Sequence, residues 1–162
     1  MTPHITLITT PTQEESEHLD SLLWEVLWKP LGLPRTFREF ARTGGGEIME
    51  SGEICHEYEC VAMKDGVVTG GLVAIFGSSS KCEIRHIAVL PEEQDKGCGT
   101  MLIEALVAYA SGKGFQAIHT IARNTSVPFF LKAGFACGKG NVPDHPIFLQ
   151  HGISFVMMER RL

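Results

Sequence analysis

The stretch from Glu83 to Thr100 reads EIRHIAVLPEEQDKGCGT, and its pattern indicates the central unit of the fold. The β-rich run Glu83 to Leu90 is typical of a strand. Gly97 and Gly99 mark a tight turn, and apolar residues then recur at helical spacing from Met101 to Tyr109. The stretch therefore predicts a strand, a glycine loop and the start of a helix.

The rest of the chain supplies further strands and helices around this unit. Before it we expect a strand over His4 to Thr9, a helix begun by a capping box at Thr12 and Glu15, a short helix over Arg35 to Arg42, and a hairpin of Tyr58 to Met63 and Val67 to Phe76 around Asp65-Gly66. After it we expect a strand over Gln116 to Ala122, a helix over Val127 to Ala133, a candidate strand over Phe135 to Cys137 and a last strand over Ile153 to Met158.

This order predicts an α/β (α+β) fold for a single domain spanning residues 1–162. A hairpin meander that leads into a β-α-β-α unit indicates one mixed, mostly antiparallel sheet flanked by helices. The crossover from Glu83–Leu90 to Gln116–Ala122 should be parallel and right-handed. A chain of 162 residues is long enough to bury about 70% of the surface that its unfolded form exposes.

Composition excludes several classes of protein. The net charge of −5 disfavours a nucleic-acid binder and favours a cationic small molecule. The absence of a run of about 18 apolar residues argues against a membrane span, and the first residues do not resemble a secretory signal. Five cysteines without a CxxC pair indicate free thiols, no metal site and a cytoplasmic location.

The loop before the helix is suited to an anion. Backbone N–H groups at a helix N-terminus point at such a ligand, glycines allow close approach, and Lys96 adds a cation. A Walker loop requires GxxxxGK[ST], which the chain lacks, and a dinucleotide loop requires a third glycine where Leu102 stands. We therefore expect a phosphate-containing ligand that is bound by neither of these two kinds of loop.

The spacing Gln94-x-x-Gly97-x-Gly99 resembles the Q/R-x-x-G-x-G/A loop of the GNAT superfamily of acyl-CoA-dependent N-acetyltransferases. The run Asn124 to Phe135 resembles a second signature of that family, and the likeness extends over roughly Glu57 to Phe135. It implies acetyl-CoA as cosubstrate and the GNAT fold, whose fourth and fifth strands are splayed. The cofactor-binding residues it implies are Ile87, Ala88, Val89, Gln94, Asp95, Lys96, Gly97, Cys98, Gly99, Thr100, Asn124 and Phe130.

Strand spacing predicts an irregularity beside the loop. Ile84 lies three residues before Ile87, so the two can share the core face only if a β-bulge near Arg85-His86 breaks the period of two. In the resembled family, a bulge there opens the slot for the pantetheine arm. Backbone groups of the strand can then pair with the pantetheine amides.

Glu83 is the candidate catalytic base, since some members of the resembled family carry a carboxylate at that place; His86 and water are the alternatives. The Ile87 N–H is the candidate oxyanion donor. Phe130 stands where the family usually has a general-acid tyrosine, which leaves Cys137, His86, water or unassisted thiolate departure. The helix N-terminus should lower the pKa of Cys98, whose side chain is expected to point away from the ligand.

The leading hypothesis is an N-acetyltransferase that transfers acetyl from acetyl-CoA to a primary amine of a small molecule or peptide by direct attack. The amine is expected to be cationic in water, drawn to a mouth lined by Glu47, Glu50, Glu53, Glu57 and Glu59. No nucleic acid or membrane partner is expected, and a homodimer is a candidate assembly. A non-catalytic acyl-CoA sensor and a cofactor-free interaction module remain as alternatives.

Overall fold

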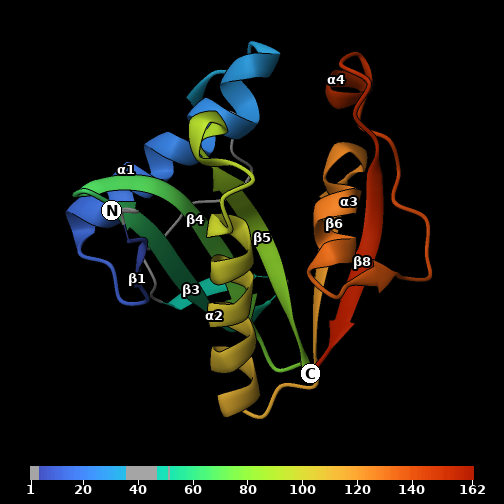
Figure 1. The fold of residues 1–162 in the computed structure, drawn as a ribbon. Helices are drawn as coiled ribbons and strands as arrows, with labels where there is room; N and C mark the ends of the chain where they lie inside the picture. Colours follow the sequence, from blue (N-terminus) through green and yellow to red (C-terminus); the bar gives the residue numbers. More distant parts are fainter. Residues whose placement is uncertain (1–3, 36–46, 51) are drawn as a thin grey trace.

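The computed structural model describes residues 4–35, 47–50 and 52–162. These residues form an eight-stranded sheet in the order β1-β3-β4-β5-β6-β8-β7, with β2 paired to β3 (Figure 1). The strands are β1 (Thr6–Ile8), β2 (Glu47–Glu50), β3 (Glu53–Lys64), β4 (Val67–Phe76), β5 (Lys81–Val89), β6 (Ala117–Arg123), β7 (Ala136–Cys137) and β8 (Phe155–Arg161). Among the described pairs, β5 and β6 are parallel and the others are antiparallel, so the expected mixed sheet is confirmed.

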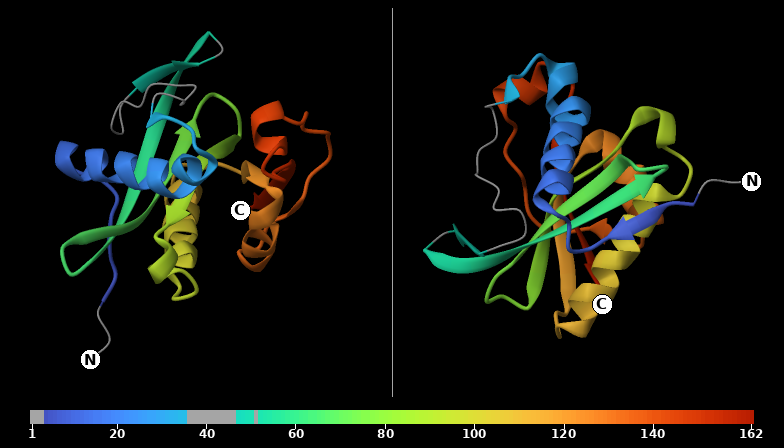
Figure 2. Two further views of the ribbon diagram at one scale, coloured as in Figure 1. Left: turned by 90° about the horizontal axis from the view of Figure 1, so that it is seen from above. Right: turned by 90° about the vertical axis from the view of Figure 1, so that its left-hand side faces the viewer.

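Helices cover both faces of this sheet (Figure 2). Helix α1 (Gln13–Leu23) packs on one face, where Leu19 and Leu23 meet Val61 and Val73. Helix α2 (Cys98–Gly112) packs on the opposite face, in a core cluster with residues that alternate with the first set along the strands: Cys60, Leu72, Ala74 and Ile84. The sheet therefore has two apolar layers, and the alternation along each strand decides which side chain enters which layer.

The predicted start of α1 is confirmed. The Glu15 N–H donates to Thr12 Oγ1 at 3.2 Å, and the Thr12 N–H donates to Glu15 Oε1 at 2.8 Å. The helix continues as a π-turn η1 (Trp24–Trp28) and a 3-10 turn η2 (Lys29–Leu31), and it ends at Gly32, whose φ of 73° suits glycine. The expected helix over Arg35 to Arg42 lies largely outside the described residues.

The predicted hairpin turn is confirmed, since Asp65 and Gly66 have φ of 53° and 76°. Two short elements are not predicted. Strand β2 has no alternating pattern of its own and exists through its pairing with β3. Helix α4 (Pro146–Leu149) is too short to show a helical period. The short helix α3 (Val127–Lys132) follows β6 as expected.

The predicted bulge is present in β5 and opens the sheet. Val73 of β4 lies opposite His86 and Ala74 lies opposite Ile84, so Arg85 is the extra residue. Beyond the bulge β5 diverges from β6, and the pairing of these strands runs only from Lys81 and Ala117 to Ile84 and Thr120. The two strands then separate as the two arms of a V (Figure 1).

No helix among the described residues is long and apolar enough to span a membrane.

Candidate functional site

The open edge of β5 exposes backbone hydrogen-bonding groups. The Leu90 N–H donates to the Thr69 carbonyl at 2.9 Å, which makes Thr69 and Leu90 a hydrogen-bonded pair of the β4–β5 ladder. Pairs alternate in an antiparallel ladder, so Ala88 bonds toward β4, whereas Ile87 and Val89 direct their N–H and C=O groups toward the slot. The expectation that Ala88 offers backbone groups to a pantetheine arm is therefore wrong. For Ile87 and Val89 the expected role stays a prediction.

The loop after β5 leaves several amides at the N-terminus of α2. The first i−4 bond of the helix runs from the Met101 N–H to the Gly97 carbonyl at 3.0 Å, so the amides of Cys98, Gly99 and Thr100 precede the intrahelical ladder. Gly97 has φ of 87°, and a Cβ built there would meet nothing within 4 Å. The free amides and the helix dipole favour an anion at this end of α2, and its binding there stays a prediction.

Other loop residues shape this site. Gln94 Nε2 donates to the Val89 carbonyl at 3.0 Å, so this side chain secures the end of β5. Asp95 has φ of 62° and is part of the turn. Lys96 is exposed and lies 3.9 Å from Glu93. A Cβ on Gly99 would lie 2.7 Å from Cε1 of Phe129, so this glycine is required where α2 meets α3.

Cys98 is buried within the loop, with its side chain in the core under α2. Burial raises the pKa of its thiol above the ordinary value, and the negative charge of Glu93 acts in the same direction. The expectation of a lowered pKa is wrong, because desolvation of the thiolate outweighs the hydrogen bond with Thr69, which acts in the opposite direction. The side chain does point away from the loop surface, so Cys98 can contribute only its amide to a ligand.

Asn124 uses its side chain to hold the segment before β8. Its Nδ2 donates to the Gly152 carbonyl at 3.2 Å, and its Oδ1 accepts from the Ser154 N–H at 3.1 Å. A contact between Asn124 and a pantetheine arm stays a prediction. Phe130 is buried among Phe129 and Phe135 and also reaches the slot. Cys137 is exposed on β7 and is not part of the described lining of the slot.

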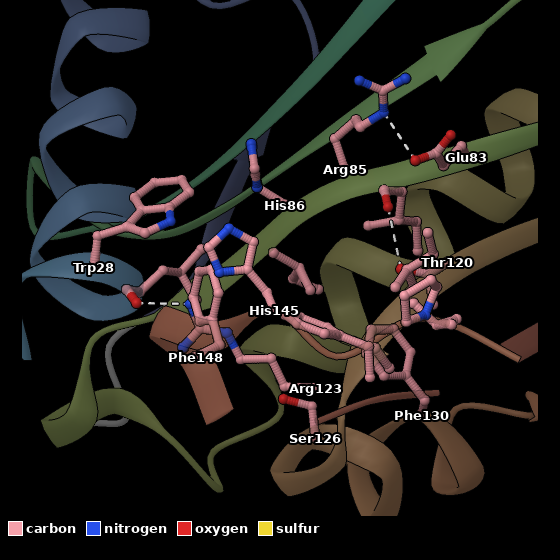
Figure 3. A pocket seen from close by; sticks show the side chains of 18 residues that line it. Trp28, Glu83, Arg85, His86, Thr120, Arg123, Ser126, Phe130, His145 and Phe148 are labelled. Atoms are coloured by element: carbon pink, nitrogen blue, oxygen red, sulfur yellow. Dashed lines mark hydrogen bonds and ion pairs between the residues drawn. The ribbon is translucent and has the colours of Figure 1, made fainter. Parts of the chain in front are cut away.

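A cavity of about 440 Å³ lies where β5 and β6 diverge. Its described lining comes from η1, β5, β6, the 3-10 turn η5 (Asn124–Ser126), α3, residues 142–148 and β8. Figure 3 shows Trp28, His86, Arg123, His145 and Phe148 around it, and Thr120 at one side. The Thr120 Oγ1 donates to the Ile84 carbonyl at 3.1 Å, which pins the point where the strands part.

Glu83 lies in this cavity between two basic side chains. Its Oε1 is 2.8 Å from Nε of Arg85, and its Oε2 is 3.6 Å from Nε2 of His119 (Figure 3 shows the Arg85 contact). Burial lowers the pKa of Arg85. His86 packs edge-on against Trp28, with ring centroids 5.0 Å apart. Both candidate bases therefore line the cavity, and which of them accepts a proton stays a prediction.

Three of the five glutamates expected at a substrate mouth, namely Glu53, Glu57 and Glu59, lie in β3 and do not line the cavity. Glu57 and Glu59 are 0% and 1% exposed within the sheet, and Ser16 Oγ donates to Glu59 at 2.7 Å. Glu53 caps the turn at Ser78. None of the three belongs to the described lining of the cavity. Strand alternation alone does not reveal this, because the face that holds Glu57 and Glu59 is buried by other segments.

Sequence reasoning missed much of the cavity wall. Trp28, Arg123, Ser126, His145 and Phe148 all line it. Trp28 follows Trp24 at a spacing of one helical turn, which suits either a core or a pocket wall, whereas no local pattern marks the other four, since they come from three separate segments. The described residues hold no group of three or more His, Cys, Asp or Glu side chains arranged to bind a metal ion.

Residues 17–135 match the model of the acetyltransferase (GNAT) family. The fold is also similar to solved structures of low sequence identity. An acetyltransferase of the GNAT family from Staphylococcus aureus is 13% identical, with a TM-score of 0.71 over 98% of this chain and 99% of that one. The PaiA N-acetyltransferase from Thermoplasma acidophilum, solved with coenzyme A, is 14% identical, with a TM-score of 0.68 over 100% of both chains. IAA acetyltransferase from Bacillus cereus is 20% identical, with a TM-score of 0.67 over 98% of this chain and 100% of that one.

Proposed function

Because the chain belongs to the acetyltransferase (GNAT) family, we propose that it transfers an acetyl group from acetyl-CoA to a primary amine. The observation that carries this proposal is the slot between β5 and β6. The outward backbone groups of Ile87 and Val89 lie along one edge, the open amides of α2 lie beyond its end, and the cavity lies at the divergence of the strands. Along an acetyl-CoA molecule the diphosphate is followed by the two pantetheine amides and then by the acyl group. The amides of α2, the edge of β5 and the cavity would hold these three parts in the same order.

The chain's residues fit the cosubstrate. The amides of Cys98, Gly99 and Thr100 suit the diphosphate, because they are open and unobstructed at Gly97. The edge of β5 at Ile87 and Val89 suits the pantetheine amides in the manner of an added strand. Acetyl-CoA supplies an activated acyl group as a thioester. The Ile87 N–H is the donor for the oxygen on which charge develops.

The reaction joins the acceptor nitrogen to the acetyl carbon and breaks the bond from that carbon to sulfur. The electron pair of the broken bond leaves with sulfur, and the nitrogen gives up one proton. An ammonium cannot attack, so a base must first remove its additional proton; Glu83 is our candidate, with His86 or water as alternatives. Phe130 has no proton to donate, so the thiolate leaves unassisted or takes its proton from water.

A catalytically silent acyl-CoA sensor is the second candidate, and Phe130 in place of a hydroxyl donor is the observation that favours it. Two measurements separate the candidates. Acetyl-CoA should raise the melting temperature under both, whereas thiol release with a panel of primary amines should occur only for the enzyme. No stabilisation by acetyl-CoA would overturn both, and the cofactor-free interaction module would then be the better interpretation.

We also infer a cytoplasmic location, supported by five free thiols among the described residues. An acceptor amine that is protonated in bulk water remains part of the proposal, although Glu53, Glu57 and Glu59, three of the glutamates that suggested it, are not in the described lining of the cavity. A homodimer stays a candidate, to be measured by sedimentation.

A further inference from the structure

The cavity contains two arginines in different electrostatic situations. Arg85 is paired with Glu83 at 2.8 Å. Arg123 has no carboxylate within ion-pair distance among the described residues. Among the described lining residues there are thus two guanidinium groups and one carboxylate, which leaves one positive charge in excess when the histidines are neutral.

Arg123 is held in place by two contacts. Its Nη2 donates to the Leu27 carbonyl at 2.7 Å, and its guanidinium lies 5.4 Å from the ring centroid of Phe148. Figure 3 shows the side chain reaching from β6 below Phe148, well away from the Glu83 and Arg85 pair at the other side of the view. The guanidinium is therefore positioned in advance, and the group loses little freedom when it binds a ligand.

These contacts leave most of the arginine's donors available. A guanidinium has five N–H donors, and the Leu27 carbonyl takes one of them. Burial lowers the pKa of Arg123, which reflects poor solvation of its charge, yet an arginine stays protonated in proteins. A half-buried cation without a counter-ion is costly, and an anion that arrives with the substrate would offset that cost.

An apolar wall lies next to this cation. Phe148 packs edge-on against Phe155 with centroids 5.4 Å apart, and Leu27 and Trp28 face the same cavity. This apolar wall offers no hydrogen-bonding partners to a polar acceptor such as a polyamine. It suits a ligand with an apolar body beside a single negative charge.

We propose that Arg123 binds the carboxylate of the acceptor, so that the acceptor is an amino-acid-like amine with an apolar side chain. This inference rests on the proposed acetyl transfer and names its substrate class. One excess positive charge matches a carboxylate better than a phosphate, which carries nearly two negative charges at neutral pH. A guanidinium can bind a carboxylate through two parallel N–H donors.

The first test compares matched acceptors with the wild-type protein. Thiol release from acetyl-CoA is measured with L-phenylalanine, L-phenylalaninamide and 2-phenylethylamine. We expect kcat/KM for the acid to exceed that for the other two by about tenfold or more, mainly through KM, because it gains a charge-assisted bond. The amine of L-phenylalaninamide is less basic, so a larger share of it is neutral and able to attack at neutral pH. This difference favours the amide, so a preference for the acid would have to overcome it. Equal or better use of the amide overturns it.

The second test removes the guanidinium. In Arg123→Gln, kcat/KM for L-phenylalanine should fall about tenfold or more while that for the amide changes less than threefold. Arg123→Lys keeps the charge and should retain part of the preference. Arg160→Gln is the matched control, because Arg160 also donates to a backbone carbonyl, that of Ala133 at 2.8 Å, but lies outside the described lining. An equal loss of kcat/KM for the acid and the amide in Arg123→Gln would mean that Arg123 only supports the structure of the cavity, and it would overturn the proposal.

Calorimetry separates this inference from the proposed function. L-phenylalanine should bind the protein saturated with CoA, and L-phenylalaninamide should bind more weakly. If no amine releases thiol but the acid binds through Arg123, acetyl transfer fails and the carboxylate site stands. If amines release thiol without any preference for a carboxylate, acetyl transfer stands and the site fails. Better use of 2-aminoethylphosphonate than of β-alanine would identify a phosphate-type anion and overturn the carboxylate assignment.

Discussion

The two sides of the slot between β5 and β6 are built differently. On the β5 side, the groups that we propose to bind the cosubstrate are backbone amides and carbonyls from one continuous stretch, Ile87 to Thr100. On the acceptor side, they are side chains from separate segments, among them Trp28, Arg123 and Phe148. Backbone chemistry depends on local conformation, whereas a side-chain wall depends on which distant segments pack together. The difference implies that substitutions on the two sides should affect different constants.

The strongest test of the β5 side is Gly97→Val. A branched residue at φ of 87° forces the loop to change shape and misdirects the amides of α2. Losing two charge-assisted hydrogen bonds of about 1.5–3 kcal/mol each corresponds to CoA binding that is about 100-fold weaker or more. Calorimetric titration with CoA measures this.

Gly114→Val is the matched control for that change. Gly114 has φ of 82° and open space around its Cβ position, but it lies at the other end of α2. It should lose similar stability and keep its CoA affinity. Equal CoA affinity in Gly97→Val and wild type would mean that the loop does not bind the diphosphate.

On the acceptor side, Glu83→Gln should lower kcat by about 100-fold, at the low end of what general-base catalysis contributes. CoA affinity should change little, because Glu83 is not part of the backbone edge. Glu104→Gln is the control, since Glu104 is also 2.8 Å from an arginine but is exposed outside the cavity. A wild-type rate for Glu83→Gln across pH 6 to 9 would exclude Glu83 as the base and favour His86 or water.

Phe130→Tyr tests whether the slot lacks a proton donor for the departing thiolate. The new hydroxyl would stand where a proton donor for the thiolate is missing, so kcat should stay equal or rise by up to about tenfold. Phe135→Tyr is the control, because Phe135 is equally buried at 3% exposed but does not line the cavity. Single-turnover rates measure the chemical step. A fall in the rate for a folded Phe130→Tyr would argue against a missing general acid.

Cys98→Ala should have the smallest effect, with CoA affinity unchanged within about twofold, since the loop acts through its backbone. Burial raises the thiol pKa, so at pH 8 less thiolate is present at Cys98 in the folded protein than in the unfolded chain. Iodoacetamide should therefore label exposed Cys137 before Cys98, and denaturant should abolish the difference. Rapid labelling of Cys98 in the folded state would show that its thiol is accessible.

The sequence was most informative where neighbours along the chain make the structure. The capping box at Thr12, the turn at Asp65-Gly66 and the bulge at Arg85 were all predictable from spacing, and all three are confirmed. The buried state of Glu57 was not predictable, because its environment is supplied by other segments. The Cys98 thiol was misjudged for a related reason, since desolvation comes from the surrounding core rather than from its own helix.

The sequence by itself determined the order of the main strands and helices, though not β2 or α4, and it determined the mixed sheet, the bulge and the glycine loop at the helix start. These depend on hydrogen bonding and backbone geometry within a few residues, which a periodic pattern records. Only the tertiary structure decided that Ala88 bonds toward β4 while Ile87 and Val89 face the slot. Only it brought Arg123 next to Leu27 and Phe148 in one cavity wall. Such contacts join residues up to 96 positions apart, and no local pattern encodes which of them will meet.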